Sequence, residues 1–220
     1  MSARPRTLDL RADPGADLSV VVRHLREGGA VAYPTETVYG LGGACTDAGV
    51  TAVRDVKGRS ADKPLIALVE SETAVAGLVW TEAAKTLAET FWPGSVTLVL
   101  PDPDRIFPAG VRDPRSGTVG VRVSPHPVAR RLVRELGAPL TSTSLNVPGE
   151  PPVTSGGHAR EILERLGAPK VWLLDFGTLP SSAPSTVVDC SRPEPVVLRE
   201  GAVPLGRLRC VIPEIHATTP

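Results

Sequence analysis

The stretch that decides the fold reads Val31-Ala32-Tyr33-Pro34-Thr35-Glu36-Thr37-Val38-Tyr39-Gly40-Leu41-Gly42-Gly43. Apolar residues 30–33 predict a short buried strand, which Pro34 ends. Hydroxyl side chains and glycines follow directly, and such groups at the carboxyl end of a strand can line a ligand crevice in an α/β sheet. A glycine-rich turn, in which Thr35 and Thr37 cap local backbone groups, would explain the same residues. The stretch is neither a P-loop nor a GxGxxG motif, so both interpretations stay open.

Helical and strand patterns alternate on both sides of this stretch. Val21, Val22 and Leu25 share one face of a helix that begins near Asp17 and ends at Gly28. Further helices are predicted at 48–56, 71–78, 81–91, 127–136 and 157–166, and strands at 65–69, 95–100, 118–123, 140–144, 170–174, 185–190 and 195–199. This interleaving is typical of a layered α/β domain. The close spacing of the last strands favours a mixed sheet over an all-parallel one.

The 220 residues show no composition break or long linker, so one domain is the simplest interpretation. We expect a loose lead-in over residues 1–16, the main domain over 17–203 and a C-terminal tail over 204–220. Basic and acidic residues number 24 each, so net charge points to no nucleic-acid or membrane partner. The chain has no apolar run near the roughly 18 residues that span a bilayer and no signal peptide at its start, which predicts a cytoplasmic protein.

Three cations lie within seven residues, directly after one predicted helix and before a predicted strand: Lys57, Arg59 and Lys63. They fit a clamp for phosphates, in which arginine supplies a planar fork and lysine a point charge. On residue pattern alone, a solvated run that complements the helix dipole is the simpler explanation. The cysteines and histidines share no metal-ligand spacing, so we expect no metal held by protein side chains alone.

Hydroxyl and amide side chains end the strand predicted at 140–144. Ser142, Ser144 and Asn146 could hold phosphate oxygens or a zwitterionic amino acid, or they could form a local turn. Arg122 lies within another apolar strand pattern, where a half-buried charge needs an anionic partner. That partner is either a structural carboxylate or the carboxylate of a ligand. Residues 182–186 and Arg199 add further hydroxyl groups and a further cation.

Taken together, these segments resemble the YrdC-like family of threonylcarbamoyl-AMP synthases. The matching motifs are YPTETVYGL at 33–41, the Lys57-x-Arg59 element, WPGSVT at 92–97, VGVRV at 119–123, Ser144-x-Asn146, PSTVVD at 184–189 and Leu198-Arg199-x-Gly201. They occur in one order, with compatible spacing, from about residue 17 to residue 203. Only a short tail follows residue 203. In this respect the chain resembles the short, single-domain form of the family.

The resemblance implies a twisted mixed sheet of parallel and antiparallel strands, flanked by helices, with a concave basic cavity. It implies that L-threonine, bicarbonate or CO2 and ATP, with Mg2+, give threonylcarbamoyl-AMP and pyrophosphate. A separate threonylcarbamoyl transferase complex would then modify the adenosine next to the tRNA anticodon. No membrane contact is implied.

The resemblance also implies a role for individual residues. Four positions correspond to the L-threonine site: Thr35, Arg122, Ser142 and Ser185. Seven correspond to the ATP site: Lys57, Arg59, Lys63, Thr118, Ser144, Asn146 and Arg199. Lys57 and Arg59 are implied as the catalytic pair, because they would offset charge on the α-phosphate and pyrophosphate. The Mg2+ would be held largely by the nucleotide, with no metal ligand from the protein alone.

Three positions depart from the pattern of relatives. Ser60 stands where many have proline, Leu68 where some have a histidine that reaches the substrate, and Pro152 where some have a hydroxyl group. Three other functions fit parts of the sequence. An RNA-binding module of the same fold would bind RNA without turnover, although few aromatic residues are available for base stacking. An adenylating carbamoyl-transfer enzyme would use a different acceptor, and a sugar-phosphate enzyme would want an acidic cluster for its metal.

Overall fold

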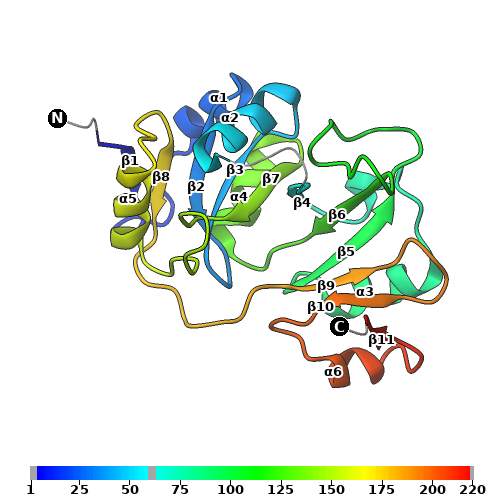
Figure 1. Ribbon diagram of the computed structural model, residues 1–220. Coiled ribbons are helices and arrows are strands. Elements are labelled where there is room, and N and C mark those ends of the chain that lie inside the picture. The colour runs from blue at the N-terminus through cyan, green and yellow to red at the C-terminus, as the bar shows by residue number, and fades with distance from the viewer. Residues whose placement is uncertain (1–3, 59–62, 219–220) are drawn as a thin grey trace.

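Helices and strands alternate in the computed structural model, which describes residues 4–58 and 63–218. The strands are β1 (Arg6–Asp9), β2 (Ala30–Pro34), β3 (Tyr39–Gly43), β4 (Ile66–Leu68), β5 (Val96–Pro101), β6 (Thr118–Arg122), β7 (Leu140–Ser144), β8 (Trp172–Asp175), β9 (Thr186–Asp189), β10 (Val196–Arg199) and β11 (His216–Ala217). The helices are α1 (Ser19–Arg26), α2 (Asp47–Lys57), α3 (Glu82–Phe91), α4 (Pro127–Leu136), α5 (Gly156–Arg165) and α6 (Leu205–Arg209), with a short 3-10 turn at Thr73–Val75. Figure 1 shows them wrapped around one twisted sheet.

The described strands join in the order β1-β8-β2-β3-β7-β4-β6-β5-β9-β10-β11. Strand β3 is antiparallel to both of its neighbours, β2 and β7, and β4 is antiparallel to β7. Parallel pairs lie further out, between β2 and β8, β4 and β6, and β5 and β9. The prediction of a mixed parallel and antiparallel sheet flanked by helices is confirmed.

Strand β2 is buried along its whole length, and its alternating side chains enter two different cores. Ala30 and Ala32 belong to a large cluster that includes residues of α2 and α5, whereas Val31 and Tyr33 pack in a second cluster with α1 and α4. Because side chains alternate along a strand, the sheet carries helices on both faces here. The helical face predicted from Val21, Val22 and Leu25 is buried as expected.

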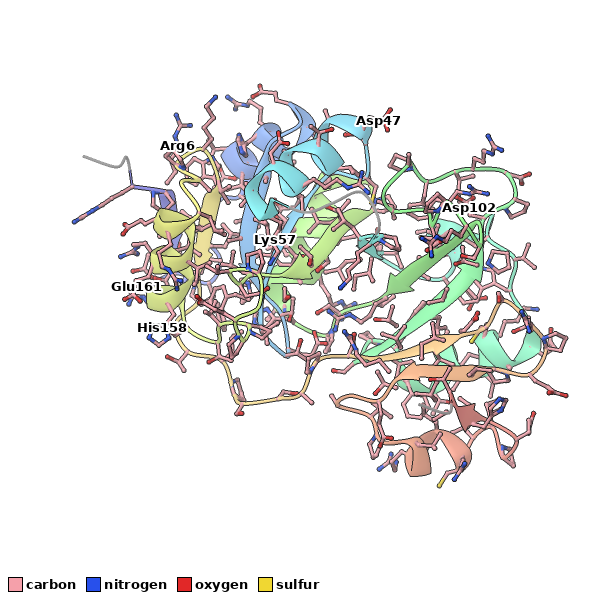
Figure 2. All side chains as sticks on the ribbon, in the orientation of Figure 1. Arg6, Asp47, Lys57, Asp102, His158 and Glu161 are labelled. Carbon is pink, nitrogen blue, oxygen red and sulfur yellow. The ribbon has the colours of Figure 1, made fainter. Side chains whose placement is uncertain are left out.

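Helix α2 brings the chain back toward the centre of the sheet. It begins at Thr46, whose hydroxyl accepts a hydrogen bond of 3.2 Å from the amide of Gly49. It ends at Gly58, which has a positive φ of 56°. The last helical residue is Lys57, which is buried. In Figure 2 it lies near the middle of the molecule.

Strand β3 was not predicted, because Tyr-Gly-Leu-Gly-Gly has weak strand propensity and reads as a turn. The glycines nonetheless fit this strand, because β3 is fully buried between β2 and β7 and leaves little room for side chains. A Cβ atom on Gly42 would lie 2.0 Å from the carbonyl oxygen of Thr141. Strand β2, predicted to stop before Pro34, includes Pro34 as its last residue and pairs it with Tyr39.

Regular structure forms near both ends of the described chain. Part of the expected loose lead-in forms β1, a parallel edge strand beside β8. In the tail, α6 and β11 lie beyond β10, at the far end of the sheet from β1 in Figure 1. Leu208, Ile212 and Ile215 bury their side chains in the large core cluster. The helix predicted at 71–78 is only the 3-10 turn. The exact domain limits at 17 and 203 stay predictions.

Candidate active site

A cavity of about 410 Å3 opens over the middle of the sheet. Its polar lining consists of Thr35, Thr37, Arg122, Ser142, Thr143, Ser144, Asn146, Ser185 and Arg199. Val38, Gly40, Pro64, Ile66, Pro152 and Pro184 complete the wall. Seven of the residues predicted from sequence therefore meet here: Thr35, Arg122, Ser142, Ser144, Asn146, Ser185 and Arg199.

The strand register explains why residues so distant in sequence share one cavity. Gly40 of β3 is opposite Ser144 of β7, and Ser142 is opposite Ile66 of β4. Strands β4 and β6 then align Leu68 with Arg122. Paired residues project to the same face of a sheet, and residues two apart do likewise. One face of three adjacent strands thus presents the hydroxyl groups and the arginine.

The loop between β2 and β3 holds Thr35 in a fixed local turn. The Thr35 hydroxyl donates to the carbonyl oxygen of Val38 at 2.7 Å and accepts from its amide at 3.2 Å. It also lies 3.1 Å from the hydroxyl of Thr37. Thr35 and Thr37 therefore organise a local turn, and both also line the cavity.

Arg122 is a buried cation whose partner is a carboxylate of the protein. Its side chain is only 4% exposed, and Nη1 forms an ion pair with Oε1 of Glu36. Two hydroxyl groups also donate to Glu36, Ser95 at 3.0 Å and Ser124 at 2.7 Å. The Nε atom of Arg122 is buried and has no hydrogen-bond partner. The requirement for an anionic partner is met by a structural carboxylate, and Arg122 still borders the cavity.

Lys57 is absent from the lining of the cavity, but it contacts two lining residues at and just beyond the end of β7. Its Nζ donates to the carbonyl oxygens of Ser144 at 3.1 Å and Asn146 at 2.7 Å, and to Oδ1 of Asn146 at 2.7 Å. The Ser144 hydroxyl donates to the same Oδ1 atom at 2.9 Å. An ammonium group has three donor hydrogens, so these contacts tie the helix end firmly to the residues that line the cavity.

Arg199 and Ser185 form the opposite wall. The guanidinium of Arg199 donates to the carbonyl oxygen of Ser185 from Nη2 at 2.7 Å and from Nε at 3.2 Å. Burial, and then the like charge of Arg122, lower the pKa of Arg199. The Ser185 hydroxyl lies 3.0 Å from that of the fully buried Thr97. The positive charges of Arg122 and Arg199 repel each other, so the binding of an anion near both would be favourable.

Some predicted residues are not brought into this cavity. Lys63 is exposed and absent from the lining, although the next residue, Pro64, is part of it. Thr118 is buried at the opposite end of β6 from Arg122, with its hydroxyl 2.7 Å from that of Ser116. Arg59 and Ser60 lie outside the described residues, so the predicted role of Arg59 stays a prediction.

The two other departures from the family pattern have different surroundings. Leu68 is buried in the core cluster shared with α1 and α4, whereas Pro152 lines the cavity. Sequence reasoning assigned no role to Glu36, Thr97 or Ser124. Glu36 lies within the quoted stretch, and the signal that could have found it is an acidic residue in a loop that otherwise carries only hydroxyl and apolar side chains.

His126 lies close to the Glu36 carboxylate and caps α4. Its Nδ1 atom accepts a hydrogen bond of 3.2 Å from the amide of Val128, and its ring packs edge-on against Phe176. Burial lowers the pKa of His126, and the charge of Glu36 opposes that shift. The histidine is therefore held neutral near pH 7.

A second cavity, of about 460 Å3, lies between α1, α2 and the loop before β8. His24, Asp55 and Lys170 line it with glycine and apolar residues, and none of the described site residues does. In residues 4–58 and 63–218, no three His, Cys, Asp or Glu side chains gather as metal ligands. Over the same ranges, every helix is too short or too polar to cross a lipid bilayer.

Comparison with known proteins gives one consistent match. The family model Sua5/YciO/YrdC, described as "Telomere recombination", matches residues 23–201. The threonylcarbamoyl-AMP synthase of Bacillus subtilis is 39% identical over 201 residues, which cover 87% of this chain and 55% of that protein. The threonylcarbamoyl-AMP synthase of Pyrococcus abyssi is 36% identical, over 90% of this chain and 58% of that protein.

A solved structure extends the match to three dimensions. The crystal structure of P. abyssi Sua5 complexed with L-threonine superposes with a TM-score of 0.84 and 34% identity. The match covers 96% of this chain and 62% of the other. The chain thus spans little more than half the length of the two curated relatives.

Proposed function

The chain belongs to the Sua5/YciO/YrdC family, and from that membership we propose that it is an L-threonylcarbamoyladenylate synthase. It would form threonylcarbamoyl-AMP and pyrophosphate from L-threonine, bicarbonate or CO2, and ATP. Two kinds of relative support this proposal: curated synthases that match most of this chain, and a similar structure solved with L-threonine. The single observation that carries it is the convergence of Arg122, Arg199 and the strand-end hydroxyl groups on one cavity.

We place L-threonine between Arg122 and three hydroxyl residues. The buried guanidinium of Arg122 suits the amino-acid carboxylate, because a planar cation pairs with a carboxylate through two parallel hydrogen bonds. The other members of this site are Thr35, Ser142 and Ser185, which border the same cavity. Thr97 supports the hydroxyl of Ser185 from behind. Apolar Ile66 and Val38 in the wall offer a surface for the threonine methyl group.

We place the nucleotide along the Lys57, Ser144 and Asn146 side of the cavity, with Arg199 opposite. Arg59 and Lys63 extend this set from the adjoining segment, as the sequence predicts. Like Lys57, the described members Lys63 and Thr118 lie outside the lining, and the Thr118 hydroxyl instead lies 2.7 Å from that of Ser116. A cluster of cations and hydroxyl groups suits the negative charge and many acceptor oxygens of a triphosphate.

The reaction needs alignment and charge neutralisation more than a nucleophilic side chain. The neutral amine of threonine attacks CO2 to form a carbamate and releases one proton. An oxygen of that carbamate then attacks the α-phosphorus, and the bond from that phosphorus to the pyrophosphate oxygen breaks. Lys57, Arg59 and Arg199 would stabilise the charge that develops, and loss of one such contact costs roughly 3 kcal/mol in the transition state.

The donor set of the cavity fits a Mg2+ ion that arrives with ATP. The described lining has hydroxyl, amide and guanidinium groups and no carboxylate, so it offers no cage of acidic ligands. Mg2+ characteristically keeps several waters and binds through nucleotide phosphates. When bound there, it would add positive charge beside the pyrophosphate leaving group.

The product would pass to a threonylcarbamoyl transferase complex that modifies the adenosine next to the tRNA anticodon. We place these steps in the cytoplasm, where ATP and tRNA are both present. Pyrophosphate release by the purified protein tests the proposal, with ATP, Mg2+ and bicarbonate present and L-threonine either added or left out. Release that requires threonine and bicarbonate, and that falls in Lys57→Ala and Arg59→Ala, is expected. No release under any condition would contradict a stand-alone synthase and favour an RNA-binding module, whereas release with another acceptor would favour a different carbamoyl-transfer enzyme.

A further inference from the structure

Glu36 is a charged residue in the β2–β3 loop that the mechanism above does not use. Its carboxylate is held from three places: Ser95 before β5, Arg122 at the end of β6, and Ser124 in the segment that follows. The side chain is 15% exposed. Glu36 is absent from the lining of the cavity, so it lies behind Arg122 and not beside a ligand.

The orientation of Arg122 depends on this carboxylate. A guanidinium that is 4% exposed needs an anion nearby, and Glu36 is that anion within the protein. Arg199 on the opposite wall carries a like charge that repels Arg122. The Nε donor of Arg122 is not used by the protein. Glu36 thus fixes one end of the guanidinium and leaves another donor without a partner.

We propose that Glu36 is a positioning residue, which holds the guanidinium of Arg122 so that its remaining donors meet the carboxylate of the amino-acid substrate. The hydroxyl groups of Ser95 and Ser124 in turn hold the Glu36 carboxylate through hydrogen bonds. This inference rests on the proposed function of the cavity and assigns to Glu36 a role in amino-acid affinity. It does not place Glu36 in contact with the reacting atoms.

Two simpler roles for Glu36 predict different behaviour. If it acted only through its charge, removing it would make the cavity more positive. Binding of the ATP analogue and of the threonine carboxylate would then become stronger. If it were only structural, removing it would lower stability and weaken threonine and nucleotide alike. A positioning role predicts a selective loss, because the nucleotide is placed on other residues.

Glu36→Ala and Glu36→Gln separate these roles. The amide oxygen of glutamine can still accept from Arg122, and its NH2 group can donate to a serine hydroxyl. Titration calorimetry would measure L-threonine and a non-hydrolysable ATP analogue binding to each variant, with thermal unfolding followed in parallel. Glu161→Ala is the matched control, because Glu161 is exposed on α5, away from the cavity.

For Glu36→Ala we expect the Kd for L-threonine to rise about tenfold or more, and the Kd for the ATP analogue to change less than about twofold. Glu36→Gln should stay within about threefold of the wild type for both ligands, since it keeps the hydrogen bonds. If Glu36→Ala does not fold, Ser124→Ala gives the same test. It should weaken threonine binding alone, by about threefold.

Unchanged or tighter threonine binding in Glu36→Ala would overturn the positioning role, as would an equal loss for both ligands. In the Ser124→Ala arm, unchanged threonine binding or an equal loss for both ligands would overturn it in the same way. A wild-type protein that binds no threonine would overturn the proposed function itself. That outcome is distinct, because it appears before any variant is made.

Discussion

The Nζ atom of Lys57, at the end of α2, donates a hydrogen bond of 2.7 Å to Oδ1 of Asn146, which lies 89 residues further along the chain. The same ammonium group also donates to the carbonyl oxygens of Ser144, the last residue of β7, and of Asn146 just beyond it. One buried cation therefore joins a helix C-terminus to the strand end that borders the cavity. Its contribution to stability and to nucleotide binding can be measured separately.

Lys57→Met removes the ammonium group and keeps most of the aliphatic stem. Because the oxygens it contacts would lose a charged donor, we expect the free energy of unfolding to fall by about 2–3 kcal/mol, and the affinity for an ATP analogue to fall as well. Urea denaturation and calorimetry check the two effects. Lys85→Met is the control. The Lys85 side chain on α3 is 44% exposed and its ion-pair partner, Glu82, lies on the same helix, so the substitution should change stability by less than about 0.5 kcal/mol. Equal losses in both variants would show that the Lys57 contacts contribute little.

Arg122→Lys and Arg199→Lys should affect different substrates. Lysine keeps the charge and loses the planar fork that matches a carboxylate or phosphate. We expect Arg122→Lys to raise the KM for L-threonine about ten- to hundredfold while the KM for ATP changes little. Arg199→Lys should show the reverse pattern. Steady-state kinetics with each substrate varied in turn would detect it, and the same pattern in both variants would contradict the two assigned sites.

Two glycines of β3 should respond very differently to a single methyl group. In Gly42→Ala the new Cβ would lie 2.0 Å from the Thr141 carbonyl oxygen, so β3 and β7 must separate. We expect a loss of more than about 3 kcal/mol of stability. In Gly40→Ala the nearest atoms are side-chain atoms, 3.2 Å away in Tyr33 and 3.5 Å away in Ser142. That variant should fold and bind threonine more weakly. Thermal unfolding of both distinguishes them, and equal stability would contradict the strand packing.

Stability should depend on pH through His126. Burial places its folded-state pKa below the ordinary value of about 6.5. The unfolded state then binds the proton more tightly, so stability falls as pH drops through 6.5 toward the folded-state pKa. His126→Asn keeps an N-cap acceptor and removes the titration. Denaturation at pH 7.5 and 5.5 should therefore show a larger loss for the wild type than for the variant. Parallel losses would show that His126 is not the group responsible.

Much of the fold could be predicted from the spacing of apolar residues along the sequence. The amphipathic faces of α1, α2 and α4 and the apolar runs of β2, β5 and β6 are local patterns, and the structure contains all of them. Strand β3 was not predicted because its glycines favour a strand only when β2 and β7 pack closely on either side of it. The edge strand β1 has polar residues and exists through pairing with β8, 166 residues further along at Arg6 and Trp172.

The candidate site was predicted residue by residue only through family resemblance. The position of Arg122 in an apolar strand pattern indicates that it needs an anion. The sequence does not reveal whether Glu36 or a ligand supplies that anion, because the answer depends on how the β2–β3 loop packs against β6. Thr97 is one of nine buried threonines and serines in the described chain, and only tertiary contacts reveal its role. Its partner, Ser185, lies 88 residues away.

The central claim is that this cavity joins threonine, a one-carbon unit and AMP in one product. Mass spectrometry of the reaction with ATP, Mg2+, L-threonine and carbon-13 bicarbonate tests it most directly. We expect threonylcarbamoyl-AMP that carries the heavy carbon, formed together with pyrophosphate and missing when threonine is left out. Pyrophosphate release without that product, or a product that contains no bicarbonate carbon, would contradict the proposed synthase.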